Sequence, residues 1–201
     1  MDGVLFDTIP FAQKSFLATH PGMTEEMYKE IHSGNYFEGA KKFSHFFKIE
    51  TEEEKKYRQK QYSEIKSQAL MFKGVKELLE ELHEKGYILI LNTNAYERNC
   101  LPLLENSGIT TIFDFIASAE ISKDKMDKFK LIKDKYSADK KDILFITDAL
   151  GDIKDADISD VPTVAVTWGV HDRLFLEREK HLNLIGIVDT VKELEDFIEK
   201  Y

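Results

Sequence analysis

The second half of the chain alternates between two patterns of apolar residues. Leucine and valine recur at the spacing of one helix face from residue 75 to 82, and Gly86 then marks the end of that helix. A continuous apolar run follows at residues 87–91, which is typical of a strand buried on both faces. This pairing of a helix with a buried strand predicts one unit of an α/β fold.

The same alternation continues to the end of the chain. Helices are predicted near 96–107 and 126–136 and from 191 onward, and strands at 112–116, 143–146, 164–166 and 185–188. Strands separated by helices predict right-handed crossovers and a parallel sheet. We therefore expect a three-layer, Rossmann-like α/β core.

Residues 11–70 carry a different pattern. They are rich in Phe, Tyr, Glu and Lys and contain no strand-like run, so they are predicted to form several helices. Residues 51–54 match a capping box that opens a long helix toward Leu70. The predicted organisation is a core built from residues 1–10 and 71–201, with residues 11–70 as an inserted helical domain.

Composition narrows the class of protein. The chain has 201 residues, 42% of them hydrophobic and 32% charged, which suits a well-buried core, and its net charge is −9. That charge argues against nucleic acid or an anionic membrane surface as a partner. The sequence shows neither an apolar run of membrane-spanning length nor a secretory signal, and Cys100 is its single cysteine, so we expect a cytoplasmic protein.

Polar residues follow the buried runs. Residues 92–94 come after one predicted strand, residues 147–152 after another, and three lysines at 123, 125 and 128 surround the start of a helix. Ligands of an open parallel sheet bind beyond the carboxyl ends of its strands. Carboxylates gathered there suit Mg²⁺, and a hydroxyl with a lysine suits phosphate oxygens.

Each of these features has a simpler interpretation when taken alone. Asp148 and Asp152 are equally typical of helix caps, and Thr93 followed by Asn94 is more typical of a helix start. A single lysine is usually solvated, and Asp2-Gly3 is usually a turn. The order Asp, Thr, Lys, Asp-x-x-x-Asp, with each member at a strand end or before a helix, favours a phosphate site.

Three stretches resemble signatures of the haloacid dehalogenase superfamily of hydrolases. The family's first signature, Asp-x-Asp-Gly-(Thr/Val)-Leu, resembles residues 1–8 without its first Asp. The second resembles the strand that ends in Thr93-Asn94, and the fourth resembles residues 143–152, although Thr147 stands where glycine is commoner. The chain is most similar to the phosphoglycolate phosphatase-like and β-phosphoglucomutase-like group, whose small helical cap matches residues 11–70 in position and length.

The resemblance implies roles for individual residues. Asp2 would be the acid/base, and its backbone carbonyl, Asp148 and Asp152 would hold Mg²⁺. Thr93, Asn94 and Lys125 would bind the substrate phosphate. Lys125 is chosen because it directly precedes the predicted helix; Lys123 and Lys128 remain candidates, since the usual Lys-Pro pair is absent. The implied partner is a small phosphorylated metabolite.

The family's nucleophile, the first Asp of the signature, would stand directly before Met1. We therefore predict a magnesium-dependent phosphatase that works through an aspartyl-phosphate, and no turnover by the 201-residue chain. Without the strand that carries this Asp, an apolar trough is expected near the centre of the sheet. Two explanations are open: Met1 is an internal methionine of a longer enzyme, or the chain is a non-catalytic remnant that binds Mg²⁺ or a phosphorylated ligand. Within the family, a dehalogenase or a sugar-phosphate mutase is a further alternative.

Overall fold

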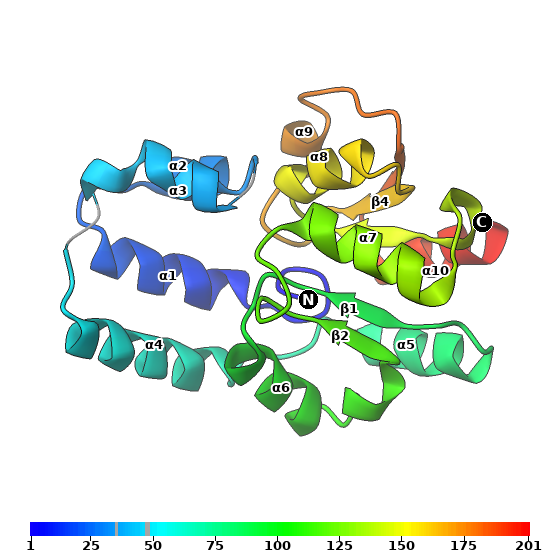
Figure 1. Cartoon of the computed structure of the whole chain (residues 1–201), viewed down its shortest axis with the longest axis horizontal. Coiled ribbons are helices and arrows are strands. Elements are labelled where there is room, and N and C mark those ends of the chain that lie inside the picture. The colour runs from blue at the N-terminus through cyan, green and yellow to red at the C-terminus, as the bar shows by residue number, and fades with distance from the viewer. Residues whose placement is uncertain (35, 47–48) are drawn as a thin grey trace.

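A helical lobe forms the first third of the molecule. The computed structural model describes residues 1–34, 36–46 and 49–201, without the side chains of residues 36–38. The lobe comprises α1 (Ile9–Thr19), α2 (Glu25–Ile31), α3 (Tyr36–Lys42), the 3-10 helix η1 (Ser44–Phe46) and α4 (Glu52–Lys66). It lies to one side of the rest of the chain (Figure 1). Thr51 caps α4 in the predicted capping box.

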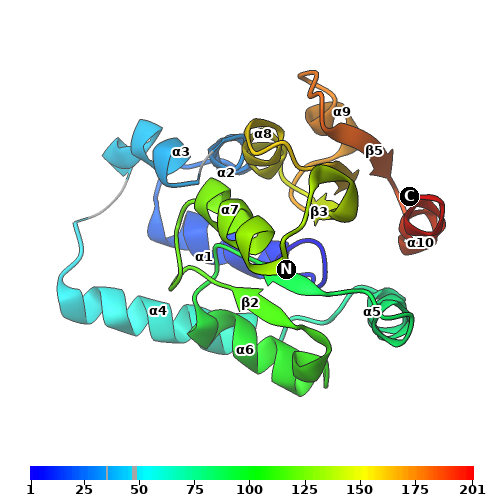
Figure 2. The same ribbon diagram turned by 45° about the vertical axis from the view of Figure 1, so that its right-hand side comes forward.

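The remaining residues form the α/β part. Its helices are α5 (Val75–Glu84), α6 (Glu97–Asn106), η2 (Thr110–Ile112), α7 (Lys125–Tyr136), η3 (Lys140–Asp142), α8 (Leu150–Ile158), α9 (Arg173–Leu176) and α10 (Val191–Lys200). Its strands are β1 (Ile90–Asn92), β2 (Phe115–Ala117), β3 (Phe145–Thr147), β4 (Thr163–Val166) and β5 (Leu184–Val188). Helices lie on both sides of the strands (Figures 1 and 2), which confirms the predicted α/β class.

The strands pair in parallel, as predicted, and form two separate sheets. One sheet has the order β1-β2, with Ile90 opposite Phe115, and the other has the order β3-β4-β5. β1 and β2 are shorter than the predicted strands. The predicted start of β2 is the 3-10 helix η2, and Ile88, ahead of β1, is 58% exposed. A strand needs a partner for its backbone groups, and within the described residues one edge of β1 and one edge of β3 have none.

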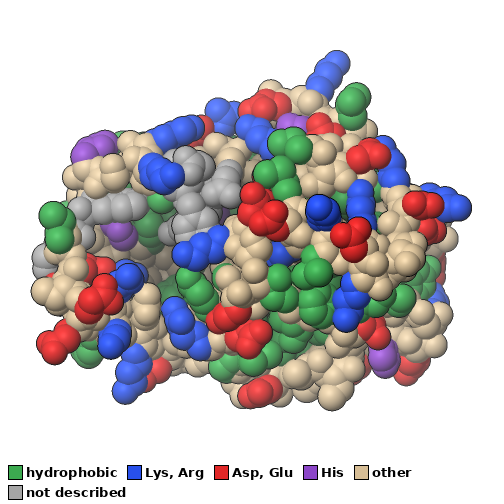
Figure 3. Space-filling view, in the orientation of Figure 1, with side chains coloured by type: hydrophobic (Ala, Val, Ile, Leu, Met, Phe, Trp, Pro, Cys, Tyr) green, Lys and Arg blue, Asp and Glu red, His purple; other side chains and the backbone are tan. Residues whose placement is uncertain are grey.

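An apolar groove separates the two sheets. It has a volume of about 510 Å³ and is lined by residues 87–92 on one side, by residues 143–146 on the other, and by Met1, Val4 and Leu5 at its end. In Figure 3, hydrophobic side chains gather in the middle of the face over the region of β1 and β2. The groove is the apolar trough that the sequence predicted.

The buried apolar residues concentrate in the α/β part. The largest cluster packs Val75 and Leu79 of α5 against Leu103 and Leu104 of α6, and Phe6 joins it from the N-terminal turn. A second cluster packs α5 and α10 against β4 and β5. The helix-face pattern of residues 75–82 is thereby confirmed. Among the described residues, no helix combines the length and apolar character needed to cross a membrane.

Candidate functional site

Asp2 lies in a tight N-terminal turn at the junction of the two parts. The backbone N–H groups of Val4, Leu5 and Phe6 donate to the carbonyl oxygen of Met1, at 3.3, 2.8 and 3.2 Å. Gly3 adopts a φ of 68°, a conformation that favours glycine. The turn places the carboxylate of Asp2 beside the end of α4.

Two side chains hold the carboxylate of Asp2. The hydroxyl of Thr8 donates to Oδ1 at 2.6 Å, and Nζ of Lys66, at the end of α4, lies 2.7 Å from Oδ1 and 2.9 Å from Oδ2. Burial raises the pKa of Asp2, but Lys66, the amino group of Met1 and the hydroxyl of Thr8 together lower it more, so this pKa lies below its ordinary value. The helical lobe therefore supplies the counter-ion of a residue in the α/β part.

Asp148 follows β3 and lies against the N-terminal turn. Its side chain is buried, and its Oδ2 accepts a hydrogen bond from the backbone N–H of Val170 at 2.7 Å. A Cβ at Gly3 or at Gly169 would overlap this carboxylate, so both backbones approach it as only glycine allows. Burial raises the pKa of Asp148 to about 6.

Asp152, in the first turn of α8, is paired with Lys125. Nζ of Lys125 lies 2.6 Å from Oδ2 of Asp152, and the hydroxyl of Thr147 donates to the same oxygen at 2.8 Å. Burial alone would raise the pKa of Asp152, but Lys125 and Thr147 lower it. The two carboxyl groups thus differ in pKa: that of Asp148 lies close to neutral pH, whereas that of Asp152 is lowered and its side chain stays ionised.

The loop after β1 is held by another lysine. Lys128 is fully buried, and its Nζ donates to the backbone carbonyl of Thr93 and to Oδ1 of Asn94, at 2.6 Å each. Burial, helped by the nearby ammonium of Lys125, lowers the pKa of Lys128 to about 7. The hydroxyl of Thr93 accepts the backbone N–H of Ala95 at 3.0 Å.

The structure therefore places the predicted residues around one region. Asp2 contacts the helical lobe, the turn around Gly3 contacts Asp148, and Asp152 contacts Lys125. Lys125 and Lys128 are buried, whereas Lys123 is exposed. Which of the buried lysines meets a phosphate stays a prediction.

Asp148 and Asp152 offer carboxylate oxygens, which are the ligands that a hard divalent cation prefers. Asp148 offers a buried carboxylate that is difficult to ionise without a cation nearby. The ammonium of Lys125 already supplies part of the positive charge at this place, because it neutralises Asp152. Among the described residues, the carboxylates that converge most closely are elsewhere, on the surface of α5 and α10, at Glu81, Glu195 and Glu199.

Three residues at this region were not selected from the sequence. Lys66 is 2% exposed although it ends a helix of otherwise charged and polar residues, and it meets Asp2 from 64 positions away. Thr8 stands six positions after Asp2, and His171 is buried beside α8. The contact of Thr8 is local, whereas Lys66 and His171 contact segments that only the fold brings close to them.

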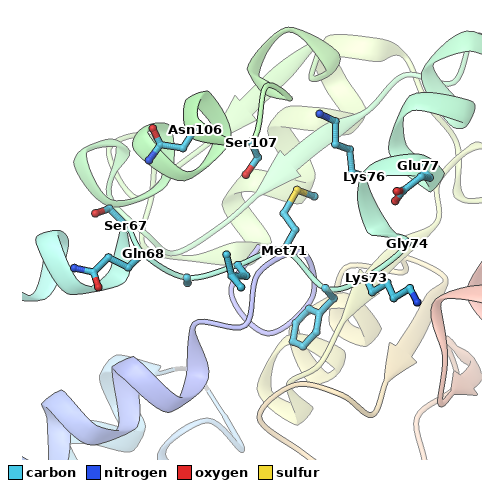
Figure 4. A pocket seen from close by; sticks show the side chains of 12 residues that line it. Ser67, Gln68, Met71, Lys73, Gly74, Lys76, Glu77, Asn106 and Ser107 are labelled. Carbon is cyan, nitrogen blue, oxygen red and sulfur yellow. The ribbon is translucent and has the colours of Figure 1, made fainter.

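A second hollow lies at the return from the lobe to the α/β part. It has a volume of about 420 Å³ and is lined by residues 67–74 and by Lys76, Glu77, Asn106 and Ser107. Figure 4 shows these side chains around the strand-like segment at Met71. None of the residues predicted to bind metal or phosphate lines it.

Known proteins share both the sequence pattern and the fold. The model of the haloacid dehalogenase-like hydrolase family matches residues 1–166. A phosphoglycolate phosphatase of Mesorhizobium japonicum is 34% identical over 111 residues, which cover 54% of this chain and 49% of the relative. A phosphoglycolate phosphatase of Aliivibrio fischeri is 30% identical over 102 residues, 49% of this chain and 45% of the relative. The chain thus spans about half the length of these curated relatives.

Solved structures confirm the architecture. A crystal structure of a predicted phosphatase from Clostridium acetobutylicum has a TM-score of 0.78 at 19% identity, covering 100% of this chain and 96% of that one. CbbY from Rhodobacter sphaeroides, crystallised in complex with phosphate, has a TM-score of 0.75 at 17% identity and covers 96% of this chain and 93% of its own. At these identities the likeness concerns the fold. With the family model covering most of its length, the chain belongs to the haloacid dehalogenase-like hydrolase family.

Proposed function

We propose that the protein is a magnesium-dependent phosphatase that hydrolyses a small phosphomonoester through an aspartyl-phosphate. The observation that carries the proposal is the meeting of three elements at the ends of β1 and β3. These are the carboxylate of Asp2, the acidic loop that bears Asp148 and Asp152, and the buried lysines of α7. Phosphoryl transfer needs an arrangement of this kind, with cations that hold the phosphate and a carboxylate that moves a proton.

Thr93, Asn94 and Lys125 are the proposed phosphate ligands. Their position after β1 and at the start of α7 supports this role, as does the burial of Lys125 beside Asp152. Lys128 is the alternative, because its ammonium contacts both Thr93 and Asn94. A buried ammonium interacts strongly with phosphate oxygens, since little water competes for it.

The backbone carbonyl of Asp2, Asp148 and Asp152 are the proposed Mg²⁺ ligands. When bound, the ion would neutralise charge on the phosphate oxygens and on the two carboxylates. The raised pKa of Asp148 supports this assignment, because a cation next to it would lower that pKa and stabilise its ionised form.

Asp2 is the proposed acid/base. As an acid it would protonate the leaving oxygen, and as a base it would then take a proton from the attacking water. Lys66 holds Asp2 in the ionised form, which suits the second step. Protonation of the leaving group requires that this ion pair loosen, so we propose that the lobe, residues 11–70, acts as a cap whose position regulates the protonation of Asp2.

The groove between β1 and β3 supports a proposal for the nucleophile. A catalytic form would carry an extended apolar segment in this groove, ending in an Asp directly before Met1. Both polar side-chain atoms of Asn92, in the groove wall, are buried without a hydrogen-bond partner, and burial lowers the pKa of the amino group of Met1. A strand in the groove would supply neighbours for the side chain of Asn92, and the peptide bond to the preceding Asp would replace the buried amino group of Met1 by an uncharged amide.

An extension of the chain tests this function. One variant adds six residues before Met1, five of them β-branched and the last an Asp, and its matched control ends in Asn instead. We expect Mg²⁺-dependent release of phosphate from a panel of small phosphomonoesters by the Asp form alone. Because two curated relatives are phosphoglycolate phosphatases, the panel begins with 2-phosphoglycolate.

Two results would overturn the proposal. Equal turnover by the printed 201-residue chain and the Asp form would show that no upstream Asp is needed. Release of halide from 2-haloacids by the Asp form, without phosphate release from any phosphomonoester, would favour a dehalogenase.

A further inference from the structure

The lobe touches the α/β part at a second place, where the end of α2 meets the first turn of α8. The backbone N–H of Gly151 donates to the carbonyl oxygen of His32 at 3.0 Å. A Cβ at Gly151 would overlap the backbone of Gly34, so the two segments approach as closely as glycine permits. At the rim, Arg178 pairs with Glu30 at 3.1 Å. Figure 2 shows α2 beside α8.

His171 links the two sides of this contact. Its side chain is fully buried and stacks on Phe175, with ring centroids 4.0 Å apart. Nδ1 lies 3.0 Å from the backbone nitrogen of Leu150, in α8, and Nε2 lies 3.0 Å from the carbonyl oxygen of Lys29, in α2. Both nitrogens of one ring are thus bound to backbone atoms of different parts of the molecule.

These partners determine the state of the ring. A backbone N–H can only donate and a carbonyl can only accept, so Nδ1 accepts from Leu150 while Nε2–H donates to Lys29. The ring is therefore neutral and protonated on Nε2. Burial, which lowers the pKa of His171 to about 4, agrees with a neutral ring.

We propose that His171 is a positioning residue that couples the position of the helical lobe to the acidic loop between Asp148 and Asp152. While α2 is docked, the carbonyl oxygen of Lys29 binds Nε2 of the ring, and Nδ1 binds the backbone N–H of Leu150. Leu150 is the first residue of α8 and lies between Asp148 and Asp152. When α2 moves away, the ring loses the acceptor that orients it. Leu150, almost fully buried, then loses a well-placed partner for its N–H.

The coupling acts in both directions. If a docked lobe orders the acidic loop, then whatever orders the loop favours the docked lobe by the same free energy. The inference rests on the proposed function only where it treats the lobe as a cap. Its test requires no turnover, so its failure is distinguishable from a failure of the phosphatase proposal.

Two variants of His171 separate the two halves of the link. In His171→Asn the side-chain oxygen takes roughly the place of Nδ1, so the contact to Leu150 is kept and the contact to Lys29 is lost. In His171→Gln the amide nitrogen takes roughly the place of Nε2, so the contact to Lys29 is kept. The readout is amide hydrogen exchange by NMR at Gly151, whose partner is His32 and not residue 171.

We expect exchange at Gly151 to be at least fivefold faster in His171→Asn than in wild type, and closer to wild type in His171→Gln. Glu30→Gln is the control: it removes the ion pair with Arg178 at the rim and leaves Arg178 on the ring of Phe175, and we expect less than a twofold change at Gly151. A ligand-free sample suffices. Unchanged exchange at Gly151 in His171→Asn would overturn the proposal.

A variant that leaves His171 in place gives an independent measurement. Gly151→Ala adds a methyl group that overlaps Gly34 and should displace α2. We expect the ring ¹⁵N shifts of His171 to move away from those of a fixed Nε2–H tautomer. Ring shifts identical to wild type, in a variant whose α2 amides exchange faster, would show that the ring does not sense the lobe.

Discussion

The helical lobe and the α/β part are stabilised in different ways. Helix α1 has no buried residue, and the buried residue of α4 is a lysine, Lys66. In the α/β part, four clusters of buried apolar residues pack the helices against the strands. The lobe meets the rest through polar contacts at Asp2 and at α8 and through Phe11 of α1, whose partly buried side chain packs against the cluster of α5 and α6. Contacts of that kind can break and re-form without unfolding, whereas a packed core cannot.

The same contrast separates the two carboxylates at the site. Asp2 has its ammonium partner in the lobe, and its pKa is held low. Asp148 is buried within the α/β part, and its pKa is raised to about 6. The state of Asp2 thus depends on where the lobe lies, and the state of Asp148 depends on the α/β part itself.

A pair of truncations in the two regions should give the largest difference. Leu104→Ala empties a fully buried position, and we expect a loss of about 2–5 kcal/mol in the free energy of unfolding. Leu17→Ala, at a half-buried position of α1, should cost less than half as much, since less apolar surface returns to water. Urea unfolding of both variants measures the difference. Equal losses would contradict the contrast between the two regions.

Removal of the cation from the lobe tests the first carboxylate. In Lys66→Met the pKa of Asp2 should rise, because burial remains and the ammonium of Lys66 is gone. We expect a loss of about 1–2 kcal/mol in stability near pH 7, less than for a fully buried pair because the Asp2 side chain is 32% exposed.

The pH dependence of that loss has a definite sign. A carboxyl whose pKa is lowered by folding stabilises the protein above its unfolded pKa, and this contribution disappears as the pH falls through the folded pKa. The difference between wild type and Lys66→Met should therefore shrink in acid. Lys60→Met, which removes an exposed pair with Glu64 on the same helix, is the matched control. An NMR titration of the Asp2 carboxyl in the two variants checks the assignment.

The second carboxylate is tested through Mg²⁺ binding. Because the pKa of Asp148 is about 6, roughly nine-tenths of this group is protonated at pH 5, so Mg²⁺ should bind about tenfold more weakly there than at pH 7.5. The fluorescence of Trp168, next to the Gly169 that contacts Asp148, can follow the titration. Asp148→Asn should bind Mg²⁺ weakly at both values. An affinity that is independent of pH in wild type would remove Asp148 from the metal site.

Local patterns in the sequence were sufficient for much of this picture. The 3.6-residue period at 75–82, the apolar runs and the capping box at Thr51 predicted elements that the structure confirms, because each depends on neighbours within a few positions. The Asp-Gly turn and the Asp-x-x-x-Asp pair pointed to the family that the family model confirms. Both are short local patterns, and the second stands where the apolar run of β3 ends.

Only the tertiary structure decided which polar and charged groups contact one another. Lys128 lies under Thr93 and Asn94, Lys66 pairs with Asp2, and His171 binds α2 and α8 together. It also fixed the lengths of the strands in the two sheets on either side of the apolar groove that the sequence predicted. Contacts between residues distant in sequence depend on how elements pack, and side-chain charge states depend on the burial that packing creates. The sequence by itself determined the elements and the family, and packing determined the partners.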